Sequence, residues 1–214
     1  MASSRKVIEL FYDVVSPYSW VGFEVMCRYR NVWNIDLKLR PAFLGGVMQG
    51  SGNKPPGLVP NKFLYMTTDL HRLAQYFQVP ISPPTDPFEV MFEKGSLSAM
   101  RFVAAVQERE VGGDKQVEQV SRELWKRIWS QDKDITQPAS LSEAAMKAGL
   151  SASEVEELLK LSTSKEIKDK LKRSTKEALD HGERSGWDPS LLLPNCDMKL
   201  GHDWDLKPAM YSLR

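Results

Sequence analysis

Cysteine is scarce in this sequence of 214 residues, which contains only Cys27 and Cys196. The two residues lie far apart and lack the spacing of a metal site, so the sequence has neither a cysteine metal motif nor the disulfide framework of a small secreted protein. We therefore expect a protein of a reducing compartment. Cys27 falls within a predicted helix and is expected to pack as a small apolar residue.

Long apolar runs are also missing. No run approaches the roughly 20 residues needed to span a bilayer, and Glu9 interrupts the only apolar stretch near the N-terminus. Arg5 and Lys6 are too few for a convincing transit peptide, and residues 212–214 do not form the usual peroxisomal tripeptide. We expect no membrane association, and we find no targeting signal.

Neither sign of charge is in excess, because 29 Lys and Arg residues nearly balance 28 Asp and Glu residues and leave a net charge of +1. No overall field would attract a polyanion, so we expect no nucleic acid partner and predict a small neutral or singly charged ligand. The histidines, His71, His181 and His202, are scattered and lack the spacing of metal ligands. We therefore expect no metal site.

The first part of the chain has the pattern of a βαβ unit. Residues 7–12 carry β-forming and apolar residues on both faces, as in a central strand. Residues 35–40 alternate between apolar and charged side chains, which predicts a half-buried strand that stops at Pro41. We expect the two strands to be parallel. Between them, a helix is predicted from Pro17 to about Trp33, with its buried face formed by Tyr18, Val21, Val25, Tyr29 and Val32.

Helical patterns dominate the rest of the chain. Residues 45–60, rich in glycine and proline, have no period and predict a long loop. Periodic apolar residues then predict helices around 63–77, 97–104 and 117–128, with Trp125 and Trp129 interpreted as core residues. Three capping boxes predict three more helices, the last of which is expected to end at Gly182. The boxes are Ser140 with Glu143, Ser151 with Glu154, and Thr163 with Glu166.

Ser16 and Pro17 mark the point where the first buried strand gives way to the helix. Serine is favoured at the N-cap and proline at the first helical position, so the pair predicts a helix start. Many such pairs are caps and nothing more. However, ligands of open α/β sheets bind at the carboxyl ends of the strands, and a helix N-terminus favours negative charge. The turn is therefore also a candidate site for an anionic ligand.

Four stretches of the sequence resemble the kappa class of glutathione transferases. They are Tyr12-Asp13, Ser-Pro-Tyr-Ser-Trp at 16–20, Gly-Asn-Lys-Pro-Pro-Gly at 52–57, and Gly-Ser-Leu-Ser-Ala-Met-Arg at 95–101. The likeness runs from about Lys6 to about His181. Because this class is similar to the bacterial oxidoreductase DsbA, the resemblance implies an α/β fold in which a thioredoxin-like domain carries a large inserted helical domain.

The resemblance also implies how the chain is divided. Residues 1–60 would form the N-terminal part of the thioredoxin-like domain, and residues 61–164 the inserted helical domain. Residues 165–182 would form a helix that returns to the thioredoxin-like domain. Residues 183–214 would form a divergent tail, because the similarity stops before them.

The resemblance implies that the ligand is glutathione, the co-substrate of this class. It makes Ser16 the catalytic hydroxyl and places Ser16, Pro17, Tyr18 and Asn53 in contact with glutathione. DsbA-like relatives have Cys-x-x-Cys at this turn, whereas this chain has Ser16 and Ser19, and disulfide exchange needs thiols. The chemistry predicted here is therefore stabilisation of the thiolate of a bound ligand.

Two basic residues are further candidates for the site. Lys62 and Arg101 could pair with the two carboxylates of glutathione. Exposed basic side chains are commonly only solvated, so that alternative stays open for both residues.

By order of magnitude, a hydroxyl at a helix N-terminus is sufficient to stabilise a thiolate. An ordinary thiol has a pKa near 8.5 and is mostly protonated at neutral pH. Lowering the pKa by about two units requires about 2.7 kcal/mol of preference for the anion. A helix N-terminus contributes roughly 0.3 to 2 kcal/mol, and a hydrogen bond to a charged group roughly 1.5 to 3 kcal/mol. The glutathione thiolate would then attack a small electrophile or reduce an organic hydroperoxide.

The resemblance fails in residues 183–214, where we predict no strand. The family would continue into a turn with a cis-proline, two more strands and a further turn that contacts glutathione. The C-terminal strand pair is therefore expected to be missing or replaced, and glutathione binding to weaken by about tenfold or more, because each lost hydrogen bond contributes roughly 0.5 to 1.5 kcal/mol.

Three functions stay open on the sequence. The first is a glutathione transferase acting on small electrophiles. The second is a glutathione-dependent 2-hydroxychromene-2-carboxylate isomerase, which belongs to the same wider family. The third is a catalytically impaired splice-type variant that acts only as a binding or interaction protein. The family implies a homodimer located in mitochondria, with peroxisomes as the alternative.

Overall fold

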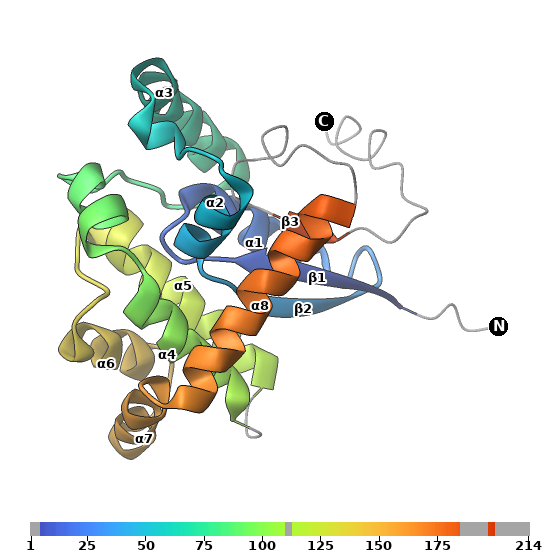
Figure 1. Ribbon diagram of the computed structural model, residues 1–214, viewed down its shortest axis with the longest axis vertical. Helices are drawn as coiled ribbons and strands as arrows, with labels where there is room; N and C mark the ends of the chain where they lie inside the picture. The colour runs from blue at the N-terminus through green and yellow to red at the C-terminus, as the bar shows by residue number, and fades with distance from the viewer. Residues whose placement is uncertain (1–4, 110–112, 185–196, 200–214) are drawn as a thin grey trace.

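The first two strands and the helix between them form a parallel βαβ unit. The computed structural model describes residues 5–109, 113–184 and 197–199. Strand β1 (Lys6–Tyr12) pairs in parallel with β2 (Ile35–Pro41), and helix α1 (Pro17–Tyr29) connects them (Figure 1). The predicted unit is confirmed, and the second strand ends at Pro41 as expected.

Helix α1 ends earlier than predicted, and its buried face agrees with the prediction only in part: Tyr18 and Val21 are buried, whereas Val25 and Tyr29 are only partly buried. It stops at Tyr29, and Val32 beyond it is 75% exposed. The prediction missed Trp20, Phe23 and Met26, whose large side chains remove more apolar area from water than valine does. The buried apolar side chains of the helix beyond Pro17 are Tyr18, Trp20, Val21, Phe23 and Met26.

A third strand, β3 (Asp197–Lys199), pairs antiparallel with β1 and gives the strand order β2-β1-β3. This strand corrects the prediction that residues 183–214 contain none. Three residues are too few for a period-two pattern to be recognised, and such a short strand is defined by pairing with its neighbour. The expected loss of the C-terminal strand pair stays a prediction, because residues 185–196 and 200–214 lie outside the described residues.

Part of the predicted loop at 45–60 is helical, which corrects that prediction. It contains helix α2 (Leu44–Ser51) and the short 3-10 helix η1 (Pro56–Leu58). A Cβ atom added to Gly50 would lie only 2.6 Å from Cδ1 of Leu179, and one added to Gly46 would lie 3.0 Å from Cγ2 of Thr175. Both of these glycines therefore allow close helix packing, at a cost in helix propensity.

Helices make up most of the remaining described chain. The six helices predicted there are confirmed, whereas the π-helical segment η2 has no counterpart in the prediction. The last helix continues to Arg184, past the expected end at Gly182. No helix within the described ranges is both long enough and apolar enough to span a membrane. The elements are α3 (Pro60–Phe77), η2 (Glu89–Lys94), α4 (Leu97–Glu108), α5 (Gly113–Gln131), α6 (Pro138–Lys147), α7 (Ala152–Ser162) and α8 (Lys165–Arg184).

One of the three predicted capping boxes is present, at Ser151 and Glu154. The box at Ser140 is wrong, because α6 begins at Pro138 and Ser140 lies inside it. The box at Thr163 and Glu166 is also wrong. Thr163 ends α7, and the side chain of the next residue, Ser164, accepts the capping hydrogen bond at 3.3 Å from the amide of Ile167. Neighbouring hydroxyl residues offer competing caps, so the pattern locates these helices without fixing their first residue.

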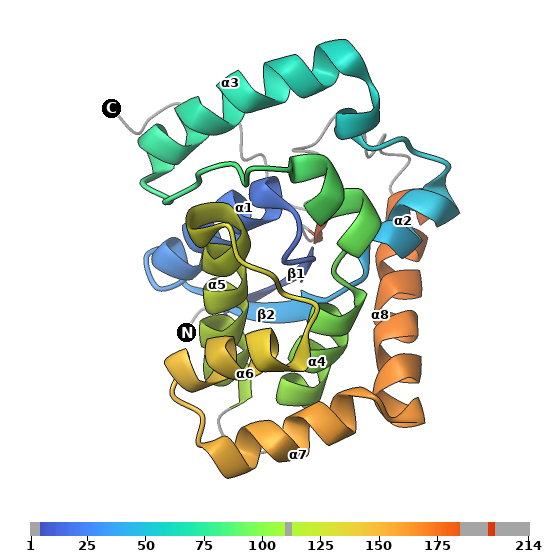
Figure 2. The same cartoon turned by 90° about the vertical axis from the view of Figure 1, so that its left-hand side faces the viewer.

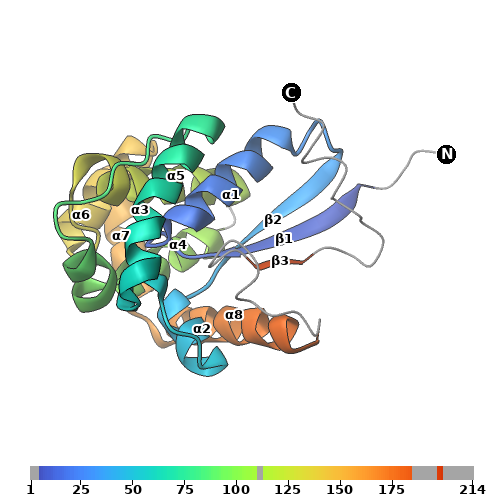
Figure 3. The same ribbon diagram turned by 90° about the horizontal axis from the view of Figure 1, so that it is seen from above.

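Helices cover both faces of the sheet. Figure 3 shows α1 on one face and α8 on the opposite face, where Ala178 packs against Phe11 and Ala42. Figure 2 shows α4, α5, α6 and α7 gathered in a helical block. One cluster of buried apolar side chains extends from the strands into this block. The turn that connects β1 to α1 therefore lies where the sheet meets the helical block.

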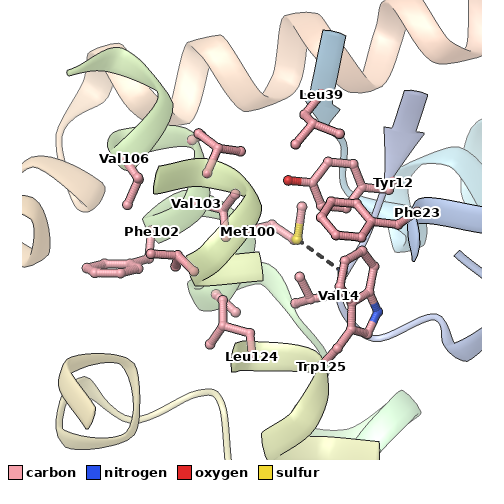
Figure 4. Packing of buried hydrophobic residues seen from close by; sticks show 14 of the residues in the cluster. Tyr12, Val14, Phe23, Leu39, Met100, Phe102, Val103, Val106, Leu124 and Trp125 are labelled. Atoms are coloured by element: carbon pink, nitrogen blue, oxygen red, sulfur yellow. Dashed lines mark hydrogen bonds between the residues drawn. The ribbon is translucent and has the colours of Figure 1, made fainter. Parts of the chain in front are cut away.

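Tryptophan side chains from α5 form part of this core. Trp125 and Trp129 are at most 1% exposed, which confirms their interpretation as core residues. The ring centroid of Trp125 lies 5.3 Å from that of Tyr12 and 4.8 Å from that of Phe23 (Figure 4). These aromatic contacts hold α5 against both β1 and α1.

Candidate active site

Ser16 caps the N-terminus of α1 just beyond the end of β1. Its Oγ accepts a hydrogen bond of 3.1 Å from the amide of Ser19, and Pro17 occupies the first turn, so the predicted cap is confirmed. Within the described part of the chain this is the one side-chain hydrogen bond of Ser16, which leaves its hydroxyl proton available to a ligand. A hydroxyl donor at a helix N-terminus favours an anion.

The backbone around Ser16 is held from the helical block. The indole N–H groups of Trp125 and Trp129 donate to the carbonyl oxygens of Ser16 and Val15, respectively. Because both indoles are buried, these hydrogen bonds are shielded from water. The turn is therefore preorganised by groups far away in the sequence.

Ser16, Pro17 and Tyr18 line a cavity of about 320 Å³. This volume lies at the small end of the roughly 300 to 1,000 Å³ typical of small-molecule sites. Most of the other lining side chains are apolar, and they include Phe43, Met48, Met66, Met91 and Phe92. The cavity therefore has a helix N-terminus, which favours an anion, at its Ser16 end. Its apolar wall is adaptable, since methionine side chains fit ligands of different shape.

The hydroxyl of Tyr18 is already engaged. It donates a hydrogen bond of 2.9 Å to Oδ2 of Asp69 on α3. Burial and the neighbouring Asp69 carboxylate raise the pKa of Tyr18, so the phenol is neutral at physiological pH. Tyr18 therefore presents its ring and backbone to the cavity, while its oxygen connects α1 to α3.

Asn53, Lys62 and Arg101 are not brought together with the other predicted residues. Asn53 is exposed and lies two residues before Pro55, which lines the cavity. Lys62 is exposed in the first turn of α3, and Arg101 is partly buried on α4. None of the three lines the cavity formed by the described residues. Their contacts with a ligand stay predictions.

Asp13 was assigned no role from the sequence, although it lies three residues before Ser16. It is 2% exposed, and burial raises the pKa of its carboxyl to about 6 in spite of hydrogen bonds from Val15, Leu44 and Ser96. An acidic residue directly after a buried strand was the available signal. At neutral pH this carboxylate is mostly ionised inside the protein, next to the candidate site.

The apolar wall supplied by α2 was also missed from the sequence. Leu44 and Met48, one turn apart, both line the cavity. Their spacing together with Val47 was a signal for a helix face, but the glycines between them obscured it.

Cys27 is not a nucleophile in this structure. It is partly buried against the main core, and burial raises the pKa of its thiol to about 12. The thiolate form is therefore negligible at neutral pH. The interpretation of Cys27 as a small apolar residue is confirmed.

Three side chains outside the cavity have ligand atoms close enough to share a metal ion. These are Glu9, Glu177 and His181, whose ligand atoms lie within 4.8 Å of one another. The guanidinium of Arg40 forms ion pairs with both glutamates. A cation bound there would have to compete with this guanidinium for the two carboxylates.

Comparison with known proteins gives consistent matches over most of the chain. The family model described as "DSBA-like thioredoxin domain" matches residues 7–182. Human glutathione S-transferase kappa 1 is 51% identical over 182 residues, which cover 85% of this chain and 79% of the relative. The protein of the same name from Rattus norvegicus is 48% identical over the same shares of the two chains. The solved structure of a 2-hydroxychromene-2-carboxylate isomerase matches with a TM-score of 0.68 at 19% identity, over 95% of this chain and 94% of that chain.

Proposed function

Because this chain belongs to the DSBA-like thioredoxin domain family and, within it, to the kappa class of glutathione transferases, we propose that Ser16 stabilises the glutathione thiolate in its active site. The membership confirms the predicted thioredoxin-like fold and the glutathione transferase function. The family match ends at residue 182, close to the point where the sequence resemblance stops.

The position of Ser16 is the observation that carries this proposal. Ser16 lies at the N-terminus of α1 and lines the cavity, and no acceptor among the described residues takes the proton of its hydroxyl. A thiolate placed there would receive a hydrogen bond to a charged group, of roughly 1.5 to 3 kcal/mol, and the field of the helix end. Together these are enough to lower the pKa of a thiol by about two units.

The reaction then needs no general base from the protein. The thiol loses its proton to solvent, and the thiolate sulfur attacks an electrophilic carbon, forming a carbon–sulfur bond as the leaving group departs with the bond electrons. Ser16 donates to the sulfur until that bond forms. Ser19 stands where a disulfide oxidoreductase has its second cysteine, so this chain has no thiol pair at the turn for disulfide exchange.

The apolar wall of the cavity is the proposed site for the electrophile. Methionine and phenylalanine side chains there would bind an apolar or aromatic substrate and exclude water from the sulfur. We propose that Pro17, Tyr18 and Asn53 complete the contacts with glutathione. Pro17 and Tyr18 line the cavity, and Asn53 lies in the same connection as Pro55 and Pro56, which also line it.

The isomerase of the same wider family is a second candidate function. It is supported by the TM-score of 0.68 to the solved isomerase structure, but a match at 19% identity shows only a shared fold. The much higher identity to kappa-class transferases favours conjugation. A non-catalytic variant is a third candidate, because residues after 182 lie outside the family match.

The finer predictions about this protein are proposals based on family resemblance. We propose a homodimer located in mitochondria, with peroxisomes as the alternative, and a role in detoxification. We also propose that the chain works without a metal, which is supported by the guanidinium of Arg40 beside the Glu9 and Glu177 carboxylates. Finally, we propose the domain boundaries 1–60, 61–164, 165–182 and 183–214, and the packing of α8 on the sheet supports the return of that helix to the thioredoxin-like domain.

Binding and activity measurements on the full chain test the proposed function. Glutathione is titrated by calorimetry, and conjugation of 1-chloro-2,4-dinitrobenzene is measured for the wild type and for Ser16→Ala. We expect saturable binding and a loss of kcat of about 10- to 100-fold in the variant, since a hydrogen bond to a charged group is removed. Ser151→Ala is the matched control, because it removes an N-cap serine from α7, away from the cavity. Absence of glutathione binding by the wild type would contradict the proposal, as would an unchanged rate in Ser16→Ala.

A further inference from the structure

The carboxylate of Asp13 bonds to three separate segments of the cavity wall. Oδ1 accepts a hydrogen bond of 3.0 Å from the amide of Val15. Oδ2 accepts one of 2.8 Å from the amide of Leu44 and one of 2.7 Å from the hydroxyl of Ser96. Val15 directly precedes Ser16, Leu44 begins α2, and Ser96 directly precedes α4. All three donors line the cavity, so one buried side chain connects three of its walls.

Asp13 also replaces the local cap of a helix. Phe43 stands at the N-cap of α2 and has no side chain that could accept from the helix N-terminus. A helix normally takes such an acceptor from its own N-cap residue. Here the first amide of α2, that of Leu44, bonds to Asp13 instead, 31 residues away in sequence. A negative charge at this helix N-terminus is favourable.

Ser96 shows the same dependence on Asp13. It occupies the N-cap position of α4, but its hydroxyl makes no capping hydrogen bond. The hydroxyl instead donates to Asp13, which is 83 residues away. Asp13 therefore connects the start of α4 to the turn at Ser16, so the position of this helix end depends on a distant residue as well as on its own sequence.

We propose that Asp13 is a positioning residue, whose carboxylate holds the Ser16 turn against α2 and α4 and so keeps the Ser16 hydroxyl in place beside the glutathione thiolate. This inference rests on the proposed function of Ser16. Asp13 is buried and is not among the described residues that line the cavity, so it acts through its hydrogen-bond partners and not on the substrate.

A purely electrostatic role of Asp13 would have the opposite sign. Two anions in one water-poor region disfavour each other, so an ionised carboxylate acting only by its charge would raise the pKa of the bound thiol. Removal of that charge would then lower the pKa of the thiol. Loss of positioning does the reverse, because a displaced Ser16 donates a longer and weaker hydrogen bond to the thiolate.

The test compares the wild type with Asp13→Asn and Asp13→Glu. The pKa of the enzyme-bound glutathione thiol is measured from the ultraviolet absorbance of the thiolate, and kcat and KM are measured with 1-chloro-2,4-dinitrobenzene. For Asp13→Asn we expect a higher pKa of the bound thiol and a kcat lower by about 10- to 100-fold, as misplacement of a reacting group produces. Asp13→Glu keeps the charge but moves the carboxylate by one methylene, and we expect no restoration of either quantity.

Two further variants keep the test decisive if Asp13→Asn does not fold. Ser96→Ala leaves the carboxylate and its two amide donors in place but disconnects α4, and we expect the same direction of change with a loss in kcat of about 2- to 10-fold. Asp134→Asn is the matched control. The Asp134 carboxylate also accepts from the amides of Thr136 and Gln137 and from hydroxyl groups, those of Thr136 and Ser140. It lies in the connection before α6 and does not line the cavity. We expect Asp134→Asn to leave kcat and the pKa of the bound thiol unchanged.

The outcomes separate this inference from the proposed function. A wild type that does not bind glutathione would overturn both. With an active wild type, only the role of Asp13 is overturned by an unchanged or lowered pKa of the thiol in Asp13→Asn, by full activity of Asp13→Glu, or by an unchanged rate in Ser96→Ala.

Discussion

The indole nitrogen of Trp125 donates a hydrogen bond of 3.0 Å to the backbone carbonyl of Ser16, which lies 109 residues earlier in the chain. Trp129, one turn further along α5, donates to the carbonyl of Val15 at 3.2 Å. Because both indoles are buried, loss of either donor would leave a carbonyl without that partner in a region shielded from water. The helical block therefore holds the backbone of the turn at Ser16 and also contributes to the core.

The first prediction concerns these two tryptophans. Trp125→Phe keeps an aromatic ring but removes the donor to Ser16, so we expect the free energy of unfolding to fall by about 1 to 3 kcal/mol. We also expect kcat to fall by about 3- to 10-fold, because Ser16, whose hydroxyl we propose to be catalytic, is less firmly held. Chemical denaturation and steady-state conjugation kinetics measure the two effects.

Trp129→Phe is the control for this prediction. It removes an equivalent donor from the same helix, but the bond that it breaks reaches Val15. We expect a similar loss of stability with a smaller change in kcat. Equal losses of kcat in the two variants would mean that general loosening of the core, and not the hydrogen bond to Ser16, sets the rate.

The second prediction is a pH dependence of stability that arises from Asp13. The pKa of its carboxyl is about 6 in the folded protein against 3.8 as the reference value, so between these values the folded state binds more protons than the unfolded state. The contribution of Asp13 to stability is therefore fully present below about pH 4 and is lost as the pH rises to about 6. A shift of about two units corresponds to about 3 kcal/mol. We expect the difference in unfolding free energy between the wild type and Asp13→Asn to change by about this amount across that window, as measured by denaturation at several pH values.

Glu154 provides a control of opposite sign. Hydrogen bonds from Ser151 and the guanidinium of Arg109 lower the pKa of its carboxyl to about 2. The contribution of Glu154 is therefore present above its ordinary pKa and is lost as the pH falls toward 2. The difference between the wild type and Glu154→Gln should change in that direction. A stability difference between the wild type and Asp13→Asn that stays constant from pH 4 to 7 would contradict the prediction for Asp13.

Local signals in the sequence were sufficient for the βαβ unit and for the cap at Ser16. The strand at residues 35–40 and the helix start at Ser16-Pro17 are determined by neighbouring residues, so a local sequence pattern is enough to predict them. Helix α2 could not be predicted in this way. Gly46 and Gly50 weaken its propensity, and the reason for both lies in Thr175 and Leu179 on α8.

The parts of the site that depend on distant residues were likewise beyond the sequence. Asp13, Leu44 and Ser96 are brought together by tertiary folding, and no spacing rule connects them. The N-cap position of Ser16 could be predicted because a helix N-terminus is encoded locally. The roles of Asp13 and Trp125 became visible only when their hydrogen-bond partners were known.

The third prediction concerns Tyr18 and Asp69, which connect α1 to α3. The 2.9 Å hydrogen bond between them lies beside a small apolar cluster of Tyr18, Met66 and Leu70, and Met66 lines the cavity. Tyr18→Phe removes only the hydroxyl, so we expect the free energy of unfolding to fall by about 1 kcal/mol. This loss is smaller than is usual for a hydrogen bond to a charged acceptor, because Asp69 is partly exposed to solvent. Since α3 carries part of the apolar wall, KM for the electrophile should rise by about 2- to 5-fold with little change in kcat.

Comparison with Asp69→Asn decides what the hydroxyl of Tyr18 does. If the hydroxyl serves only to hold α3, the two variants should raise KM for the electrophile alike and leave KM for glutathione unchanged, and the double variant should be no worse than either single variant. If the hydroxyl instead leaves Asp69 and bonds to glutathione in the complex, Tyr18→Phe alone should raise KM for glutathione. That result would contradict the arrangement seen here, in which Asp69 holds the Tyr18 hydroxyl.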